Sequence, residues 1–136
     1  MKIYTQELTV KTKRRRELIN ITSTIEEHIR KSNIRNGITL IFLPHATAAL
    51  ISNEDEPLIR KDYMETFEKL APEKYSYEHN KIDNNADSHI LSMIFKQYHI
   101  YPIIDGEIKR GTWQELMLAE FDGPRTRKIV IVAIGE

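Results

Sequence analysis

The chain has 136 residues, of which 40% are hydrophobic and 29% are charged, as is typical of a single soluble globular domain. Twenty basic residues balance twenty acidic ones, so no excess charge indicates nucleic acid or an anionic membrane as a partner. The absence of cysteine excludes disulfides and thiolate chemistry.

No stretch of the sequence is apolar over the length that a membrane span needs, and the first residues lack the apolar core of a signal peptide. We find no linker, repeat or low-complexity segment. We therefore expect one domain over residues 1–136, located in the cytoplasm.

The first half of the chain predicts three strands with a helix among them. Residues 2–11 are rich in β-favouring side chains and predict a strand. Ser23 and Glu26 have the spacing of a capping box, which predicts the start of a helix. The continuous apolar run over 38–43 predicts a buried strand, and 47–52 predicts the strand that returns beside it.

A second helix is predicted to begin at Pro57, which suits a first helical turn, and to end before Pro72. The side expected to be buried comprises Leu58, Ile59, Tyr63, Phe67 and Leu70. Residues 71–85 are polar and aromatic and predict a long ordered loop, of a kind that is often functional. A third helix is predicted from about residue 85 to residue 97.

Three strands are predicted to complete the fold, over 101–104, 112–121 and 128–134. The turns between them are expected at Asp105-Gly106 and over 122–125. Because strands and helices occur in groups and do not alternate regularly, the sequence predicts an α+β fold.

A basic run near the N-terminus comprises Lys11, Lys13, Arg14, Arg15 and Arg16. It is either an anion-binding patch or a solvated turn beside an edge strand. No aromatic residue interleaves with the arginines, which favours the solvated turn.

Three histidines carry the main chemical prediction. His45 directly follows a predicted buried strand and has small neighbours that leave room for a ligand. His89 falls in the first turn of the third helix, where positive potential favours a neutral imidazole and free backbone N–H groups favour an anion. With His79 of the long loop, these residues predict a catalytic zinc site that keeps one open position.

Several other polar residues are candidates for the same site. Glu54 and Asp122 are expected to transfer protons or to orient an imidazole. Asn85 is expected to cap the third helix, to contact a ligand, or both. Gln114 is expected to face the site, whereas Trp113 beside it is expected to pack in the core.

Arg125 lies in the predicted turn 122–125, where its guanidinium can bind a phosphate or a carboxylate. An ion pair with Asp122 is the alternative. Together these residues predict one polar cleft, assembled from distant segments, as the functional surface.

Five short motifs, in their order and spacing, resemble the YjbQ family. They are PHATAA over 44–49, NE over 53–54, NADSH over 85–89, GTWQ over 111–114 and DGPR over 122–125. The family is commonly labelled a secondary thiamine-phosphate synthase. The resemblance implies a curved, mostly antiparallel sheet with helices packed on it, and assembly as a homotrimer.

The resemblance also implies a transferase reaction and its residues. An aminopyrimidine pyrophosphate would be joined to a thiazole phosphate with loss of pyrophosphate, as a main or as a weak side activity, with a divalent zinc or magnesium ion as a candidate cofactor; the partner would be a small phosphorylated metabolite. The implied residues are His45, His89, Glu54 and Asp122 for catalysis; Thr47, Asn85, Asp87, Gln114 and Arg125 for substrate; and His45, His79 and His89 for metal.

Two other functions stay open at this point. The first is a metal-dependent hydrolase of a small phosphate or amide substrate, which would use the three histidines and one of the two acids. The second is a non-enzymatic binder of a phosphorylated metabolite.

The sequence departs from the family's usual pattern at three positions. Ala46 stands where threonine or serine is usual, and Lys96 and Tyr98 stand where glycine and a small polar residue are usual. These departures concern the substrate or a subunit contact more than the fold.

Overall fold

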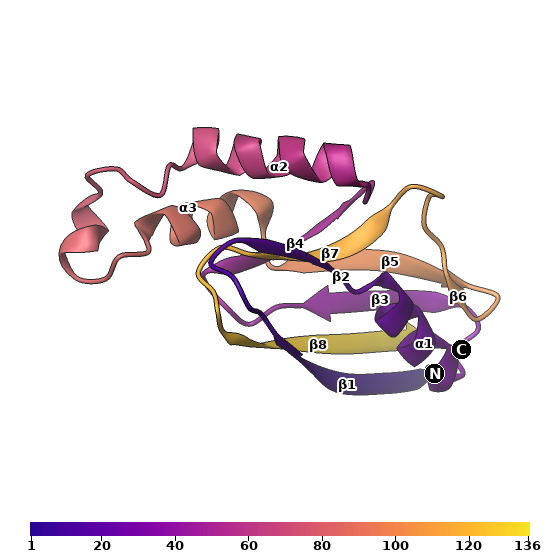
Figure 1. The fold of residues 1–136 in the computed structure, drawn as a ribbon. Helices are drawn as coiled ribbons and strands as arrows, with labels where there is room; N and C mark the ends of the chain where they lie inside the picture. The colour runs from indigo at the N-terminus through magenta and orange to yellow at the C-terminus, as the bar shows by residue number, and fades with distance from the viewer.

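The computed structural model describes all residues from Met1 to Glu136 and consists of two antiparallel sheets, three α-helices and a short 3-10 helix (Figure 1). In chain order the elements are β1 (Lys2–Lys11), β2 (Glu17–Asn20), α1 (Thr22–Ser32), β3 (Gly37–Phe42), β4 (Ala48–Asn53), α2 (Pro57–Leu70), η1 (Glu78–Lys81), α3 (Ala86–Phe95), β5 (Tyr98–Ile104), β6 (Glu107–Ile108), β7 (Glu115–Glu120) and β8 (Thr126–Gly135). One sheet has the strand order β1-β8-β3-β5-β6, and the other has the order β2-β7-β4. The α+β fold with antiparallel sheets is therefore confirmed.

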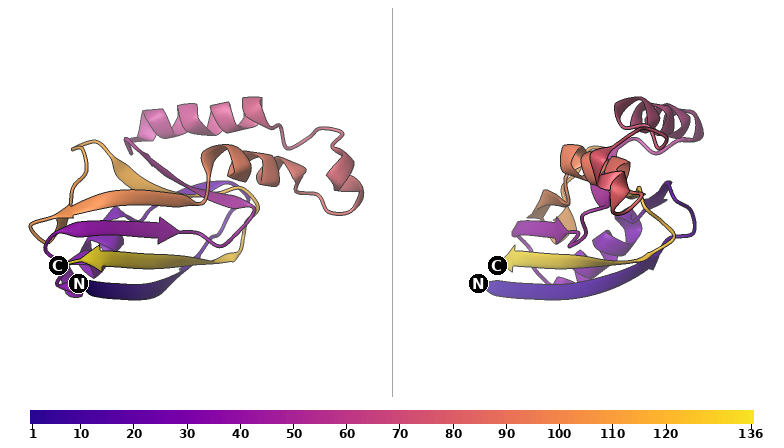
Figure 2. Two further views of the ribbon diagram at one scale, coloured as in Figure 1. Left: turned by 180° about the vertical axis from the view of Figure 1, so that it is seen from behind. Right: turned by 90° about the vertical axis from the view of Figure 1, so that its left-hand side faces the viewer.

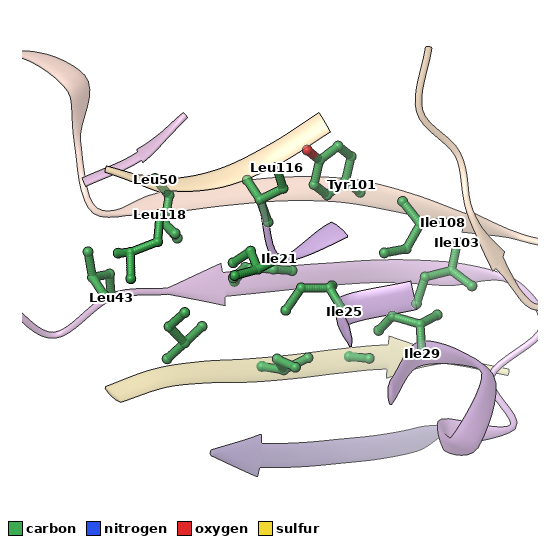
Figure 3. Packing of buried hydrophobic residues seen from close by; sticks show 14 of the residues in the cluster. Ile21, Ile25, Ile29, Leu43, Leu50, Tyr101, Ile103, Ile108, Leu116 and Leu118 are labelled. Carbon is green, nitrogen blue, oxygen red and sulfur yellow. The ribbon is translucent and has the colours of Figure 1, made fainter. Parts of the chain in front are cut away.

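The main core lies between the two sheets and includes one face of α1 (Figure 3). Ile25 and Ile29 of α1 are at most 1% exposed and pack with Ile103 of the five-stranded sheet and Leu118 of the three-stranded sheet. Because strand residues alternate between faces, the five-stranded sheet turns its other face away from this core.

A second core lies on the other face of the three-stranded sheet, under α2 and α3 (Figures 1 and 2). Phe67 of α2 and Leu91 of α3 pack there with Phe121, which follows β7. The Phe67 and Phe121 rings meet edge to face, with centroids 5.1 Å apart. The three-stranded sheet is thus covered on both faces.

The helix α2 is less deeply packed than the sequence predicts. Among its apolar residues only Phe67 is buried, whereas Leu58 and Leu70 are 67% and 50% exposed. Figure 1 places α2 on the outside of α3, so only part of this helix reaches the sheet. No helix of the chain has the length and apolarity required to span a membrane.

The start of α1 does not use the predicted capping box. The residue before the helix is Ile21, and the side-chain Oδ1 of Asn20 accepts a hydrogen bond of 2.9 Å from the Thr22 N–H. Thr22 uses its own hydroxyl to accept from the Leu116 N–H at 2.8 Å, which ties α1 to β7. The helix is therefore capped from the preceding strand, because Ser23 is not at the N-cap position.

The strands predicted from the sequence lack two short ones, and for one further strand the predicted start lies too late in the chain. The structure adds β2 and β6, each of at most four residues, which are too short for periodicity to reveal. The strand predicted from residue 101 begins at Tyr98. His99 is consequently a strand residue and not part of a connecting loop.

A buried ion pair joins β7 to β8. The Glu120 and Arg127 side chains are 0% and 3% exposed, and Arg127 Nε donates to Glu120 Oε1 at 2.8 Å. Thr12 Oγ1 donates to the same oxygen at 2.7 Å, and Arg127 Nη2 donates to Thr47 Oγ1 at 2.9 Å. Four distant segments are fixed together by this cluster.

Thr47, which the resemblance assigns to substrate binding, is held in this cluster. It is 7% exposed, and both its hydroxyl and its carbonyl oxygen accept from Arg127.

We predict that Arg127→Met lowers the free energy of unfolding by about 3–5 kcal/mol, because Glu120 keeps a buried charge without its partner. The measurement is urea unfolding followed by circular dichroism. Arg35→Met is the matched control, since its ion pair with Asp105 is exposed and should contribute at most about 1 kcal/mol. Equal losses in the two variants would contradict the role of the buried pair.

Candidate functional site

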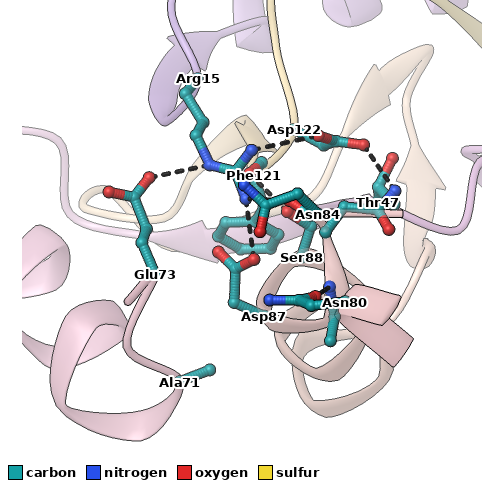
Figure 4. A network of polar contacts seen from close by, with 12 residues as sticks. Arg15, Thr47, Ala71, Glu73, Asn80, Asn84, Asp87, Ser88, Phe121 and Asp122 are labelled. Carbon is teal, nitrogen blue, oxygen red and sulfur yellow. Dashed lines mark hydrogen bonds and ion pairs between the residues drawn. The ribbon is translucent and has the colours of Figure 1, made fainter. Parts of the chain in front are cut away.

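The turn after β7 is fixed by a close approach of two backbone segments. The Gly123 N–H donates to the Arg15 carbonyl oxygen at 3.0 Å. A Cβ atom at position 123 would lie 2.1 Å from the Arg14 carbonyl oxygen, so a side chain there would require the backbone to move. This contact brings the Arg15 side chain to Asp122, as Figure 4 shows.

The Asp122 carboxylate is the centre of the polar network at this end of the molecule. It is 9% exposed and accepts from Arg125 Nη2 at 2.9 Å, from Asn85 Nδ2 at 3.0 Å and from Arg15 Nη1 at 3.4 Å. The carboxylate is thus held in place by two guanidinium groups and one amide. Its contacts suit a positioning role better than the predicted transfer of protons.

The amide of Asn85 determines which nitrogen of His79 carries the hydrogen. Since the Asp122 carboxylate can only accept, the Asn85 Nδ2 group faces it, and the Asn85 Oδ1 atom faces His79 Nε2 at 3.1 Å. His79 Nε2 is therefore the donor, and in the neutral ring Nδ1 keeps its lone pair. Asn85 makes no side-chain cap on α3, so the predicted capping bond is absent, and its contact with a ligand stays a prediction.

His79 and His89 form a pair. Their ring centroids are 5.1 Å apart and the rings are nearly perpendicular. Together with Tyr77, Ala86 and Ile90 they line a hollow of about 410 Å³. Two of the three imidazoles predicted to meet are therefore close together, one from the segment before α3 and one from α3 itself.

His45 opens into a different hollow, of about 350 Å³, beside Phe42 and Gln97. Its Nε2 atom accepts from the Lys128 N–H at 2.8 Å, so this nitrogen is occupied by the backbone. Burial, followed by the charge of Arg127, holds the pKa of His45 below its usual value of 6.5. The ring is therefore neutral at pH 7 and offers only Nδ1–H to a ligand.

One chain does not assemble the predicted zinc site. The structure contains no group of three or more histidine, aspartate or glutamate side chains arranged to hold a metal ion. His79 and His89 share one hollow, and His45 lines another. We therefore derive no chemical step from a metal, and the zinc or magnesium ion stays a prediction.

The N-terminus of α3 offers fewer free donors than predicted. The Ala86 N–H donates to Asn80 Oδ1 at 3.1 Å, and the N–H groups of Ser88 and His89 donate to the Asn85 carbonyl oxygen. Three of the first four N–H groups thus already have acceptors.

Asp87, a predicted substrate-binding residue, is buried and paired with two arginines. Its Oδ1 accepts from Arg15 Nη2 at 2.8 Å and its Oδ2 accepts from Arg16 Nη2 at 2.9 Å. The Arg16 side chain is only 8% exposed, and Arg15 also contacts Glu73 at 2.9 Å (Figure 4). The interpretation of the basic run as a solvated turn is therefore wrong for these two arginines.

Glu54 and Gln114 lie at the opposite end of the three-stranded sheet. In the pairing of β4 with β7, the first residue of β4 lies opposite Glu120, which is near Asp122. The last residue of β4 lies opposite Glu115. Five residue steps of about 3.3 Å separate the two ends by about 17 Å. Within one chain the predicted residues thus form two groups and not one cleft.

The segment around Gln114 also corrects the prediction for Trp113. Gln114 Oε1 accepts from the Gly111 N–H at 2.6 Å, which closes a tight turn. Trp113 is 71% exposed and belongs to no core. Trp113 lies in a tight turn before β7. The alternation of strand side chains between two faces, which the prediction assumed, therefore does not apply to it.

Sequence reasoning missed two contributors to the site, Arg15 and Arg127. Arg15 reaches Asp122 only through the contact of Gly123, which no local pattern reveals. Arg127 was visible, because it shares the inward parity of Ile129 and Ile131 in β8. A charged residue on a buried face requires a buried partner.

We predict that the free energy of unfolding falls as the pH drops below about 6.5, because the unfolded chain takes up protons there and folded His45 resists them. His99, whose pKa is also lowered by burial, adds a contribution of the same sign. The contribution of these two neutral histidines to the free energy of unfolding is fully present above pH 6.5. His45→Gln should show a shallower fall in urea titrations between pH 7 and 5, and equal slopes in both proteins would contradict the assignment.

Comparison with known proteins places the chain in a family. The model of the YjbQ family, described as UPF0047 protein YjbQ-like, matches residues 6–136. A UPF0047 protein of Methanothermobacter thermautotrophicus is 43% identical over 136 residues, covering all of this chain and 95% of its own length. YugU of Bacillus subtilis, another UPF0047 protein, is 33% identical, with 94% of this chain and 97% of its own length covered.

Solved structures agree with the sequence relatives. A YbjQ-like protein of unknown function from Sulfolobus solfataricus superposes with a TM-score of 0.97 at 38% identity, covering 99% of both chains. An uncharacterised YjbQ/UPF0047 protein from Clostridium acetobutylicum gives a TM-score of 0.89 at 31% identity, covering 95% of this chain and 99% of its own. The chain belongs to the YjbQ (UPF0047) family.

Proposed function

We propose that the chain is a transferase of the secondary thiamine-phosphate synthase type, which joins an aminopyrimidine pyrophosphate to a thiazole phosphate. The thiazole nitrogen attacks the methylene carbon, the carbon–oxygen bond breaks, and pyrophosphate leaves with the electron pair. This reaction needs two substrates held in line and a counter-charge for the leaving group, and no protein nucleophile.

The observation that carries the proposal is the setting of Arg125. Its Nε donates to the Asp122 carbonyl oxygen and its Nη2 donates to Asp122 Oδ2, both at 2.9 Å. Its side chain is 49% exposed, and its Nη1 has no protein acceptor. A guanidinium fixed on one side and open on the other is suited to bind the pyrophosphate group.

The histidine pair supplies the remaining chemistry at this end. Asp122 links Arg125 through Asn85 to His79, so the cation and the imidazole are held by one chain of hydrogen bonds. The lone pair on His79 Nδ1 offers an acceptor for an amino or hydroxyl group of a substrate. In this proposal, Arg125 binds the charge and the histidines orient the rings.

We predict that Arg125→Met lowers the rate of coupling by about 100-fold, the loss usual for one charge-stabilising donor. The measurement is formation of thiamine phosphate from the two purified substrates, with and without added zinc or magnesium. Arg14→Met is the matched control, because it removes an exposed cation of the basic run without contacting Asp122.

The outcome of this assay separates the three candidate functions. Absence of product with the wild-type protein under both conditions would contradict the transferase. Metal-dependent release of phosphate from a single substrate would favour the hydrolase. A rise in melting temperature with a phosphorylated metabolite, without turnover, would favour a non-enzymatic binder.

The outer face of the five-stranded sheet supports a further part of the proposal, assembly into a homotrimer. Three cross-strand rows of apolar residues run over β5, β3 and β8, and they are Pro102-Ile38-Ile134, Ile100-Leu40-Val132 and Tyr98-Phe42-Val130. Ile38 and Ile100 are more than half exposed. A contiguous apolar patch of this kind is typical of an association surface, and the number of copies follows from the family resemblance.

Assembly also offers a way to unite the two groups of site residues. Glu54 and Gln114 of one copy lie at the end of a sheet far from that copy's own Asp122. A neighbouring copy can place its Glu54 and Gln114 beside the histidine pair of the first. The single cleft predicted from the sequence would then be formed between copies.

We predict that the wild-type protein has three times the chain mass in light scattering, and that Ile100→Lys yields monomers with little coupling activity, because the charge disrupts the apolar rows. Leu58→Lys on exposed α2 is the control and should leave the mass unchanged. A monomeric wild-type protein at micromolar concentration would contradict the trimer.

A further inference from the structure

A third cavity lies away from the histidine pair and from His45, where α2 stands over β4 and the connection from α3 to β5. Its volume is about 490 Å³, which is in the range of sites for small molecules. Its lining includes Asn53 of β4, Tyr63 and Thr66 of α2, Phe95 and Lys96 at the end of α3, and His99 of β5.

Lys96 stands at the rim of this cavity in a backbone conformation that favours glycine. Its φ is 72° and its ψ is 163°, a region in which a side chain costs about 1–3 kcal/mol. The backbone is held there from both sides, since the Lys96 N–H donates to the Ser92 carbonyl oxygen and the Lys96 carbonyl oxygen accepts from the Leu50 N–H. Strain of this kind at a cavity indicates that the side chain has a function.

The ammonium group of Lys96 has no carboxylate partner in the chain; among the lysines only Lys31, Lys81 and Lys128 have one. The side chain is exposed at the cavity rim. An unpaired cation beside a concave surface is suited to meet the negative group of a ligand.

The lining of the cavity also contains polar atoms that are free for a ligand. No protein atom forms a hydrogen bond with the His99 ring, although the ring is half-buried and burial keeps its pKa below 6.5. Asn53 uses Oδ1 to accept from the Glu54 N–H, which leaves its Nδ2 group available. These atoms offer one acceptor and two kinds of donor to the edge of a ring.

Aromatic side chains form the walls. The Phe95 ring meets Phe67 edge to face, with centroids 5.3 Å apart, and is thereby fixed on one side. Tyr63 is held by its hydroxyl, which donates to the Glu54 carbonyl oxygen at 3.0 Å. Rigid aromatic walls favour a flat, unsaturated ligand over a flexible polar one.

We propose that this cavity binds a planar aromatic molecule carrying one carboxylate or phosphate group. Lys96 pairs with the negative group, Phe95 and Tyr63 contact the ring, and His99 and Asn53 bind polar atoms on its edge. The site is separate from Arg125 and the histidine pair and does not depend on the reaction proposed for them.

The test uses the full chain and amide chemical shifts in nuclear magnetic resonance. The probes are indole-3-acetate and phenyl phosphate, which distinguish a carboxylate from a phosphate, and the uncharged indole-3-acetamide. We expect saturable shifts at Asn53, Lys96 and His99, and binding of at least one anion about tenfold tighter than that of the amide. Equal binding of anions and amide, or shifts confined to other surfaces, would overturn the proposal.

Three variants keep the test independent of folding. Lys96→Gly should raise the melting temperature by about 3 °C or more, because strain is relieved, and should abolish the preference for the anion. Lys61→Gln, which removes another exposed cation, should change neither. Thr66→Trp should fill the cavity from the exposed side of α2 and prevent binding, and unchanged binding in this variant would also overturn the proposal.

Discussion

The buried pair of Glu120 and Arg127 is the constraint on which the arrangement of the site depends. Two opposite charges, both almost without solvent, are stable only if their hydrogen bonds are satisfied, and Thr12 and Thr47 provide the additional partners. The same carboxylate accepts from the Asp122 N–H at 3.0 Å. The ends of β7 and β8 and the residues after β1 and β3 are therefore fixed together, and the turn that carries the site begins from a rigid base.

A second polar layer is built on this base. Asp122 accepts from two arginines and from Asn85, and Asn85 in turn orients His79. Because the Asp122 carboxylate can only accept, it fixes which way the Asn85 amide points. The absence of a side chain at Gly123 allows the backbone contact that brings Arg15 into this layer. Charges that would repel a ligand if free are thus neutralised within the protein, while one side of Arg125 remains open.

The molecule keeps two features that do not serve the stability of a single chain. Apolar rows remain exposed on the five-stranded sheet, and Lys96 occupies a backbone region in which glycine is more stable. Both are understandable if some stability of the single chain is given up for binding. The apolar rows would bind a second copy of the chain, and Lys96 would bind an anionic ligand. The helix α2 fits the same view, because it covers a cavity instead of filling it.

The sequence by itself determined the fold class, most strands and helices, and family membership, because hydrophobic periodicity and short motifs are local properties. It indicated His45, His79 and His89 as one set and Arg125 as a candidate. Only the tertiary structure decided that His79 and His89 lie together without His45, that Asp87 and Thr47 are buried, that Trp113 is exposed, and that Glu54 lies at the far end of its sheet from Asp122. Strand register and the partner of a buried charge depend on contacts between distant segments, which local pattern does not contain.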